Sequence, residues 1–302
     1  MVMTYHTPVM LTESVDALNI QPDGTYVDVT FGGGGHSREI LKRLSSKGKL
    51  IAFDQDADAL QNVPKDPRLL FVNQNFEFMY NHLQYLNVLP VNGILADLGV
   101  SSHQFDVPER GFSFRFDAEL DMRMDQGASL TAKRVINTYS EEALYRIFKL
   151  YGEIQNAHNL AHTIVVNRSE DEVNTVFQLK DLIKTCVPKW KENQYLAQVF
   201  QALRIEVNRE LHVLQKFLLQ SAQALTPGGR LVVLSYHSLE DRLVKHFIQK
   251  GNFSGEDVKD FFGNRKSIMK PVYKKPISAG PEEIQQNPRS RSAVLRVGEK
   301  TE

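Results

Sequence analysis

Four consecutive glycines, Gly32 to Gly35, form the part of the sequence best suited to holding a ligand. The run Thr25–Thr30 before them predicts a strand, and the apolar spacing within Ser37–Leu44 predicts a helix. Glycine permits positive φ and lets a ligand approach the backbone. Exposed N–H groups at a helix start can bind a carboxylate or a phosphate. The turn therefore predicts a nucleotide-like ligand.

An acidic residue stands where ribose hydroxyls are bound in folds of this kind. Asp54 lies 20 residues beyond Gly34, at the end of the second apolar run, Leu50–Phe53. An acid at that point accepts hydrogen bonds from a ribose. A dinucleotide and S-adenosylmethionine share this geometry, so the turn and Asp54 leave both cofactors open.

Residues that follow later apolar runs separate the two cofactors. Phe76, after Leu69–Val72, is suited to pack on an adenine face, although it could equally belong to the core. Asp97, after Ile94–Ala96, can hold the cationic end of methionine or an incoming nucleophile; its alternative role is a helix cap. Gln104 can bond to the cofactor, but alone it would pass for a loop residue.

The apolar runs also indicate the fold. They are short, almost wholly apolar and separated by helical segments, and a fifth run, Leu231–Leu234, follows a Pro-Gly-Gly turn. Buried parallel strands have this character. The sequence predicts a doubly wound α/β sheet, closed by a last strand in Ser292–Val297.

The alternation breaks between the fourth and fifth runs, where about 130 residues intervene and one crossover helix would need far fewer. We expect a helical insertion over 108–194, with Trp190 in its core, and a substrate-recognition role for it. The remaining residues, 1–107 and 195–302, form the cofactor-binding domain. The expected helices are 140–150, 154–166, 178–187 and 195–224, and the last of these is the crossover helix back to the sheet.

Composition limits the function classes. Lys+Arg and Asp+Glu are each 36, so the net charge is zero, which argues against a protein coated with basic residues. Cys186 is the single cysteine, so a disulfide within the chain and a thiolate metal cluster are excluded, and a cytoplasmic location is expected. We find no signal peptide pattern and no apolar run long enough for a membrane span.

Local features add weaker hypotheses. The stretches 264–275 and 287–297 are basic and lack acids, and Arg289 and Arg291 could bind phosphate or be simply solvated. Arg110 and Arg123 lie among phenylalanines, which suits RNA contact or a domain junction. His158 and His162 have metal-ligand spacing but lack the glutamate of a zincin, so no metal is expected.

Seven blocks stand in order along nearly the whole chain: His6–Leu11, Thr30–Ser37, Asp97–Gln104, Glu109–Phe114, Leu120–Asp125, Tyr236–Arg242 and Asn287–Ser292. With these blocks the chain resembles the bacterial 16S ribosomal RNA cytosine-N4 methyltransferases, the MraW/RsmH family.

The resemblance implies a class I (Rossmann-like) methyltransferase domain with an inserted helical domain. It implies S-adenosylmethionine as the cofactor, contacted by Gly34, Gly35, His36, Asp54, Phe76, Asp97 and Gln104. It also implies 16S ribosomal RNA as the substrate, within the small subunit, with methylation at N4 of a cytosine of the decoding region.

One departure from a broader pattern concerns the target base. Many amino-methyltransferases place Asn or Asp, two prolines and an aromatic after the fourth strand, whereas this chain has Asp97-Leu98-Gly99-Val100. No aromatic is available there to stack on the base, so the residues that hold it are unassigned. Asp97 is the catalytic candidate, because an acceptor on the cytosine amine favours its reactive, pyramidal form.

His237 and Arg242 follow the fifth run at the same expected edge. We predict that they contact the RNA or support the pocket; the alternative is a structural role in capping the next helix. Three other functions stay open: a nicotinamide-dependent oxidoreductase, a non-catalytic RNA-binding module, and a methyltransferase with another substrate. The oligomeric state is not determined by the sequence, and a homodimer stays open.

Overall fold

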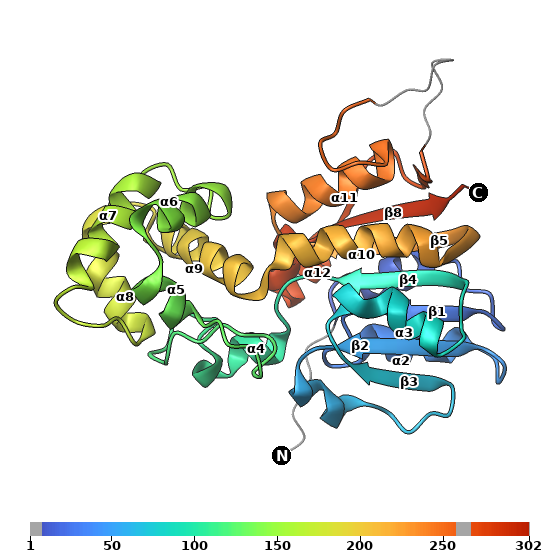
Figure 1. Ribbon diagram of the computed structural model, residues 1–302. Helices are drawn as coiled ribbons and strands as arrows, with labels where there is room; N and C mark the ends of the chain where they lie inside the picture. The colour runs from blue at the N-terminus through green and yellow to red at the C-terminus, as the bar shows by residue number, and fades with distance from the viewer. Residues whose placement is uncertain (1–7, 258–266, 302) are drawn as a thin grey trace. The chain divides into compact units, whose positions relative to one another are not determined.

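The computed structural model describes residues 8–257 and 267–301. The chain forms two compact units, Met1–Gly99 with Leu211–Glu302 and Val100–Glu210, and each is described by itself (Figure 1). Two stretches singled out in the sequence, His6-Thr7 and Asn264–Lys266, lie outside the described residues.

The first unit contains the predicted sheet. The strand order is β3-β2-β1-β4-β5-β8-β6, and β7 also pairs with β8. Strands β1 to β5 pair in parallel, while β8 runs antiparallel to β5. The strands are β1 (Thr25–Asp28), β2 (Lys49–Asp54), β3 (Leu69–Asn73), β4 (Val91–Asp97), β5 (Leu225–Ser235), β6 (Met269–Pro271), β7 (Ile277–Ser278) and β8 (Val294–Lys300). The predicted α/β fold class is confirmed, and each predicted strand is present within a few residues.

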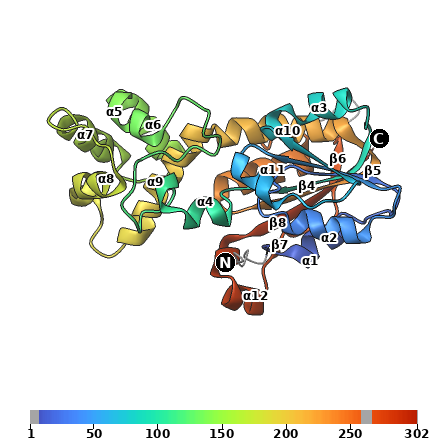
Figure 2. The ribbon, with the colours of Figure 1, turned by 90° about the horizontal axis from the view of Figure 1, so that it is seen from below.

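Helices cover both faces of this sheet, as Figure 2 shows. One face packs against α1 and α2, and the other against α3, α10 and α11, so the central strands β1, β4 and β5 are buried on both sides. The helical elements are α1 (Leu11–Ala17), α2 (Gly35–Arg43), η1 (Ala57–Asn62), η2 (Phe76–Phe78), α3 (Met79–Tyr85), α10 (Glu210–Ala224), α11 (Ser238–Lys250), α12 (Pro281–Gln286) and η5 (Pro288–Ser292).

The second unit is helical around a core of its own. Its buried side chains include Leu144, Phe148 and Leu160, each with no exposed surface. The elements are α4 (Ser102–Asp106), η3 (Pro108–Arg110), α5 (Ala132–Thr138), α6 (Glu141–Leu150), α7 (Ala157–Asn167), α8 (Val176–Ile183), η4 (Lys184–Cys186) and α9 (Glu192–Asn208). No helix of the described residues is long and apolar enough to cross a membrane.

The boundaries of this unit differ from the expected 108–194. The expected crossover helix over 195–224 is in fact two helices, α9 and α10, separated at Arg209, whose φ is +51°. Side chains of α9, among them Leu196, Val199 and Leu203, belong to the core of the second unit. The unit therefore extends to Glu210, because α9 contributes apolar surface to it rather than to the sheet.

Two further expectations concern side chains of this unit. Trp190 was expected in the core, but 95% of its surface is exposed, because it lies in the turn before α9. Arg110 is buried, and its guanidinium donates to the carbonyls of Arg123 and Met124. These contacts lie within the second unit, and Phe112 beside Arg110 is buried too. A role of Arg110 in RNA contact or at a domain junction stays a prediction.

One ion pair joins α9 to the first residue of α10, across the break at Arg209. The Arg204 guanidinium donates to both carboxylate oxygens of Glu210, at 2.8 and 2.9 Å, and both side chains are largely buried. Glu210→Gln should destabilise the second unit by about 1–3 kcal/mol, because a mostly buried cation loses its counter-charge. The free energy of unfolding is measured by urea titration, with hydrogen exchange of the α9 amides as the probe of the second unit. The exposed Glu142→Gln is the control, and an equal loss there would contradict the prediction.

Candidate functional site

Acidic residues from three strands meet at one edge of the sheet. Asp28, Asp54 and Asp97 are the last residues of β1, β2 and β4. These strands are parallel, so their carboxyl ends lie together, and Tyr236 follows the end of β5 at the same edge. Ligands of doubly wound sheets bind outside this edge, where the strand order reverses. Here the reversal lies between β1 and β4.

The glycine turn connects β1 to α2 at this edge. Gly32 and Gly34 have φ of +50° and +75°, which side chains other than glycine rarely adopt. A Cβ at Gly34 would lie 2.7 Å from Phe31 Cζ, and a Cβ at Gly35 would lie 2.0 Å from Pro8 Cγ. The glycines are therefore required by the turn itself and by the segment that packs over the start of α2.

Asp54 closes the turn from the side of β2. Its carboxylate accepts the amides of Gly32, at 2.7 Å, and Asp56, at 2.9 Å. Burial raises the pKa of Asp54 to about 6, and these two amides oppose the rise. A ribose bound here would offer hydroxyl donors to the carboxylate, which the remaining lone pairs can accept. The predicted position of Asp54 beside the turn is confirmed by the geometry; its cofactor role stays a prediction.

Asp97 is held by neighbours from two other strands. Its amide donates to Thr30 Oγ1 at 2.6 Å, and the Tyr236 hydroxyl donates to Asp97 Oδ1 at 2.6 Å. Burial raises the pKa of Asp97 to about 7, the Tyr236 hydrogen bond lowers it, and the charge of Glu240 raises it further. The helix-cap alternative is wrong, because Ser101 is the N-cap of α4.

His36 lies beside Asp97 as a neutral imidazole. It is 5% exposed, and burial lowers its pKa. Its Nε2 is 3.2 Å from the Val9 carbonyl oxygen, which can only accept, so we place the ring hydrogen on Nε2. Its Nδ1 is then an acceptor, and it lies 3.8 Å from Asp97 Oδ2, too far for a hydrogen bond.

Two acceptors thus face one another across a short gap. The Asp97 side chain keeps 22% of its surface exposed, so its carboxylate is reachable from outside. An ammonium or an amine placed there would donate to both groups and would favour the ionised carboxylate. The arrangement is suited to a cationic or amine-bearing ligand.

Phe76 and Gln104 are the two predicted cofactor contacts that this cluster does not include. Phe76 begins η2 and packs edge-to-face on Phe217, with ring centroids 5.3 Å apart, while part of its surface stays exposed. Gln104 belongs to the second unit, where its amide oxygen accepts the Ser101 amide in a capping box. Contact of either residue with a cofactor stays a prediction.

His237 and Arg242 lie at the beginning of α11. The His237 side chain caps this helix by accepting the Glu240 amide at 3.4 Å. Its Nε2 lies 3.2 Å from Glu240 Oε1, outside the angles of a hydrogen bond. The capping role is thus present, while RNA contact by His237 or by the exposed Arg242 stays a prediction.

Sequence reasoning assigned no role to three residues that shape this site. Thr30 and Tyr236 hold Asp97, and the buried Asp28 accepts the Ser37 hydroxyl at 2.6 Å, which ties β1 to α2. Tyr236 directly follows β5 as Asp97 ends β4, and these strands are neighbours. The pairing of adjacent strand ends was the signal that could have found it.

We expect Tyr236→Phe to raise the pKa of Asp97 above about 7, by about one pH unit. The hydroxyl stabilises the ionised carboxylate, so its removal favours the protonated form. Carbon-13 NMR titration of labelled aspartate measures the midpoint. Tyr85→Phe is the control, because Tyr85 is 87% exposed, and a midpoint left unchanged in Tyr236→Phe would contradict the role given to its hydroxyl.

Comparison with known proteins identifies close relatives. The model of the MraW methylase family matches residues 3–301. The chain is 54% identical over 297 residues to ribosomal RNA small subunit methyltransferase H of Bacteroides fragilis, covering 98% of each protein. It is 56% identical over 298 residues to the protein of the same name from Flavobacterium johnsoniae, covering 99% of this chain and 98% of the relative.

Two solved structures align over nearly the whole chain at lower identity. A putative rRNA-methylase from Clostridium thermocellum aligns with a TM-score of 0.44 at 12% identity, over 98% of this chain and 99% of the other. A putative methyltransferase from Streptococcus mutans in complex with SAH aligns with a TM-score of 0.41 at 13% identity, over 96% of this chain and 97% of the other.

Proposed function

The chain belongs to the MraW methylase family, and from that premise we propose that it methylates the RNA of the small ribosomal subunit with S-adenosylmethionine as methyl donor. In finer terms, we propose that the acceptor is the N4 amine of a cytosine in the decoding region of 16S ribosomal RNA. The finer assignment rests on the resemblance of the seven sequence blocks.

One observation carries the proposal at the level of atoms. Asp97 Oδ2 and His36 Nδ1 are two acceptors 3.8 Å apart at the carboxyl edge of the sheet, beside a glycine turn closed by Asp54. The residues present suit S-adenosylmethionine: Asp54 would accept its ribose hydroxyls, and the turn would receive its methionine end. When bound, the sulfonium supplies an electrophilic methyl group.

The side chains of this chain would act on the acceptor amine. The lone pair of the cytosine amine is delocalised into the ring, so the amine is a poor nucleophile. The ionised Asp97 would accept an N–H hydrogen bond, which favours the pyramidal amine and orients its lone pair for in-line attack. Tyr236 fixes Asp97 Oδ1 and leaves Oδ2 for the substrate. The proton becomes acidic only as the methyl arrives, and Asp97, with its pKa near 7, can take it.

Asp97→Asn should lower the rate of methyl transfer about 100-fold, because the amide cannot take the proton and is a weaker acceptor. Labelled methyl transfer to naked 16S RNA and to small subunits, followed by nucleoside identification, measures rate and product. Glu13→Gln, on an exposed residue, is the control and should keep the full rate.

The methyl-transfer assay and binding measurements together separate the proposal from its alternatives. A methyl group on another atom would contradict the cytosine-N4 assignment and leave the coarser function intact. Calorimetric binding of NAD without binding of S-adenosylmethionine would favour the oxidoreductase. RNA binding without cofactor binding would favour a non-catalytic module.

The affinity for S-adenosylmethionine should rise with pH. Below about pH 7 the Asp97 carboxyl is protonated and uncharged; above it the carboxylate would attract the positively charged sulfonium through space, while its Oδ2 stays available to the substrate. We expect affinity to increase by up to about tenfold for each pH unit between about 5.5 and 7 and then level off, and Asp97→Asn should flatten this rise. Calorimetry across this range measures it, and a pH-independent affinity in the unaltered protein would contradict the role of Asp97.

A further inference from the structure

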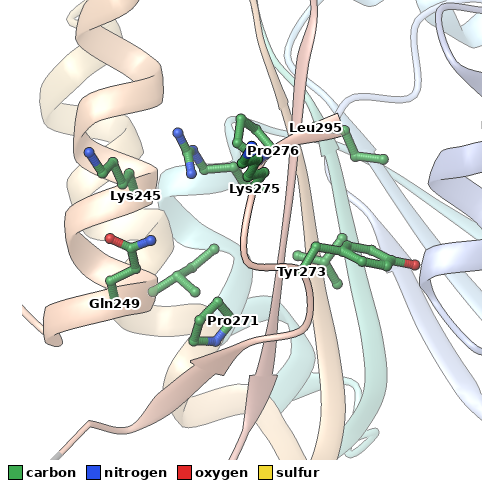
Figure 3. A pocket seen from close by; sticks show the side chains of 10 residues that line it. Lys245, Gln249, Pro271, Tyr273, Lys275, Pro276 and Leu295 are labelled. Atoms are coloured by element: carbon green, nitrogen blue, oxygen red, sulfur yellow. The ribbon is translucent and has the colours of Figure 1, made fainter. Parts of the chain in front are cut away.

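A cleft in the first unit contains none of the residues of the candidate site. It lies between α11 and the segment that joins β6 to β7, with part of β8 beneath it (Figure 3). The residues that line it are Lys245, Ile248, Gln249, Pro271, Tyr273, Lys275, Pro276, Leu295, Arg296 and Val297.

The pairing of β8 explains why the cleft exists. β6 pairs with β8 over Gly298–Lys300, and β7 pairs with it over Val294–Leu295, so Arg296 is paired with neither. β6 ends at Pro271, and the segment that follows, 272–276, is bonded to β8 at its start, where the Val272 amide donates to the Val297 carbonyl at 3.0 Å. Pro276 has no N–H to donate to the strand, and α11 forms the other wall of the cleft.

The charged groups of the cleft are all cationic. Lys245 projects from α11, and Lys275 lies on the opposite wall, as Figure 3 shows. Among the described residues that line the cleft there is no aspartate or glutamate. Within residues 8–257 and 267–301, the side chains of Lys245 and Lys275 have no ion pair or hydrogen bond.

The neighbouring acids are already engaged. The Arg296 guanidinium donates to both carboxylate oxygens of Asp241, at 2.6 and 2.9 Å, so this pair is electrically neutral. Glu299, on the same strand, pairs with Lys270 at 2.9 Å and with Arg230 at 3.3 Å. Two uncompensated ammonium groups therefore remain across the cleft, and an anion between them would relieve their repulsion.

We propose that the Lys245–Lys275 cleft binds a backbone phosphate of the RNA substrate, at a position separate from the methylated base. This inference rests on the proposed function, which supplies RNA as the ligand. The protein has no net charge, so its affinity for a polyanion must come from local sites of this kind. Phosphate contacts fix the register of an RNA on a protein and carry no sequence information themselves.

The test is a double substitution, Lys245→Gln with Lys275→Gln, in the full chain. Affinity for 16S ribosomal RNA, measured by filter binding at several salt concentrations, should fall about tenfold at about 0.1 M salt. The plot of log K against log salt should become shallower by between about 1 and 2, because two phosphate contacts are lost.

The matched control is Lys47→Gln with Lys65→Gln. Both are exposed lysines of the same unit, and in the described parts of the chain their ammonium groups are likewise without an ion pair. This control should keep the affinity and the slope of the unaltered protein. All variants should bind S-adenosylmethionine equally, which shows that the cofactor site is intact.

Three results would overturn the proposal in distinguishable ways. RNA methylation with unchanged affinity and slope in the Lys245/Lys275 variant would reject the cleft and leave the proposed function standing. Failure of the unaltered protein to bind or methylate RNA would reject both. Calorimetric binding of inorganic phosphate that is lost in the variant, with RNA affinity unchanged, would identify a site for free anions instead.

Discussion

The hydrogen bond from the Tyr236 hydroxyl to Asp97 is the interaction on which the candidate site depends. It joins the ends of two neighbouring parallel strands, β4 and β5, and Thr30 adds the end of β1 by accepting the Asp97 amide. Burial disfavours the ionised form of Asp97, while the Tyr236 hydroxyl stabilises it. The balance leaves the pKa of this carboxyl at about 7. An acid poised in this way can both hold a donor and take a proton.

Local chemistry made the centre of this site predictable from sequence. The glycine turn, Asp54 and Asp97 follow short apolar runs, and the carboxyl ends of parallel strands share one edge. His36 had no such signal, and its role was expected only from the family resemblance. The structure adds the reason for its orientation, since the Val9 carbonyl determines which ring nitrogen faces Asp97.

Features that depend on distant contacts were not predictable. The helical pattern runs on through Arg209, and only the burial of α9 in a separate core explains why the helix ends there. Trp190 has a large apolar side chain of the kind found in cores, yet it lies in the turn that precedes α9 and is exposed to solvent. From the sequence, His237 could equally have capped a helix or faced a ligand. In the structure its side chain accepts the Glu240 amide and so caps α11.

Residues 8–10, near the N-terminus, connect the site to the C-terminal part of the chain. Pro8 lies against Gly35, the Val9 carbonyl orients His36, and the Met10 amide donates to Glu283 at 2.7 Å. Residues separated by 273 positions are thus neighbours. During synthesis, the turn and strands β1 to β4 leave the ribosome long before β5, Tyr236 and Glu283. A nascent chain therefore carries the parts of the site without the assembled site, so methylation competence comes late in translation.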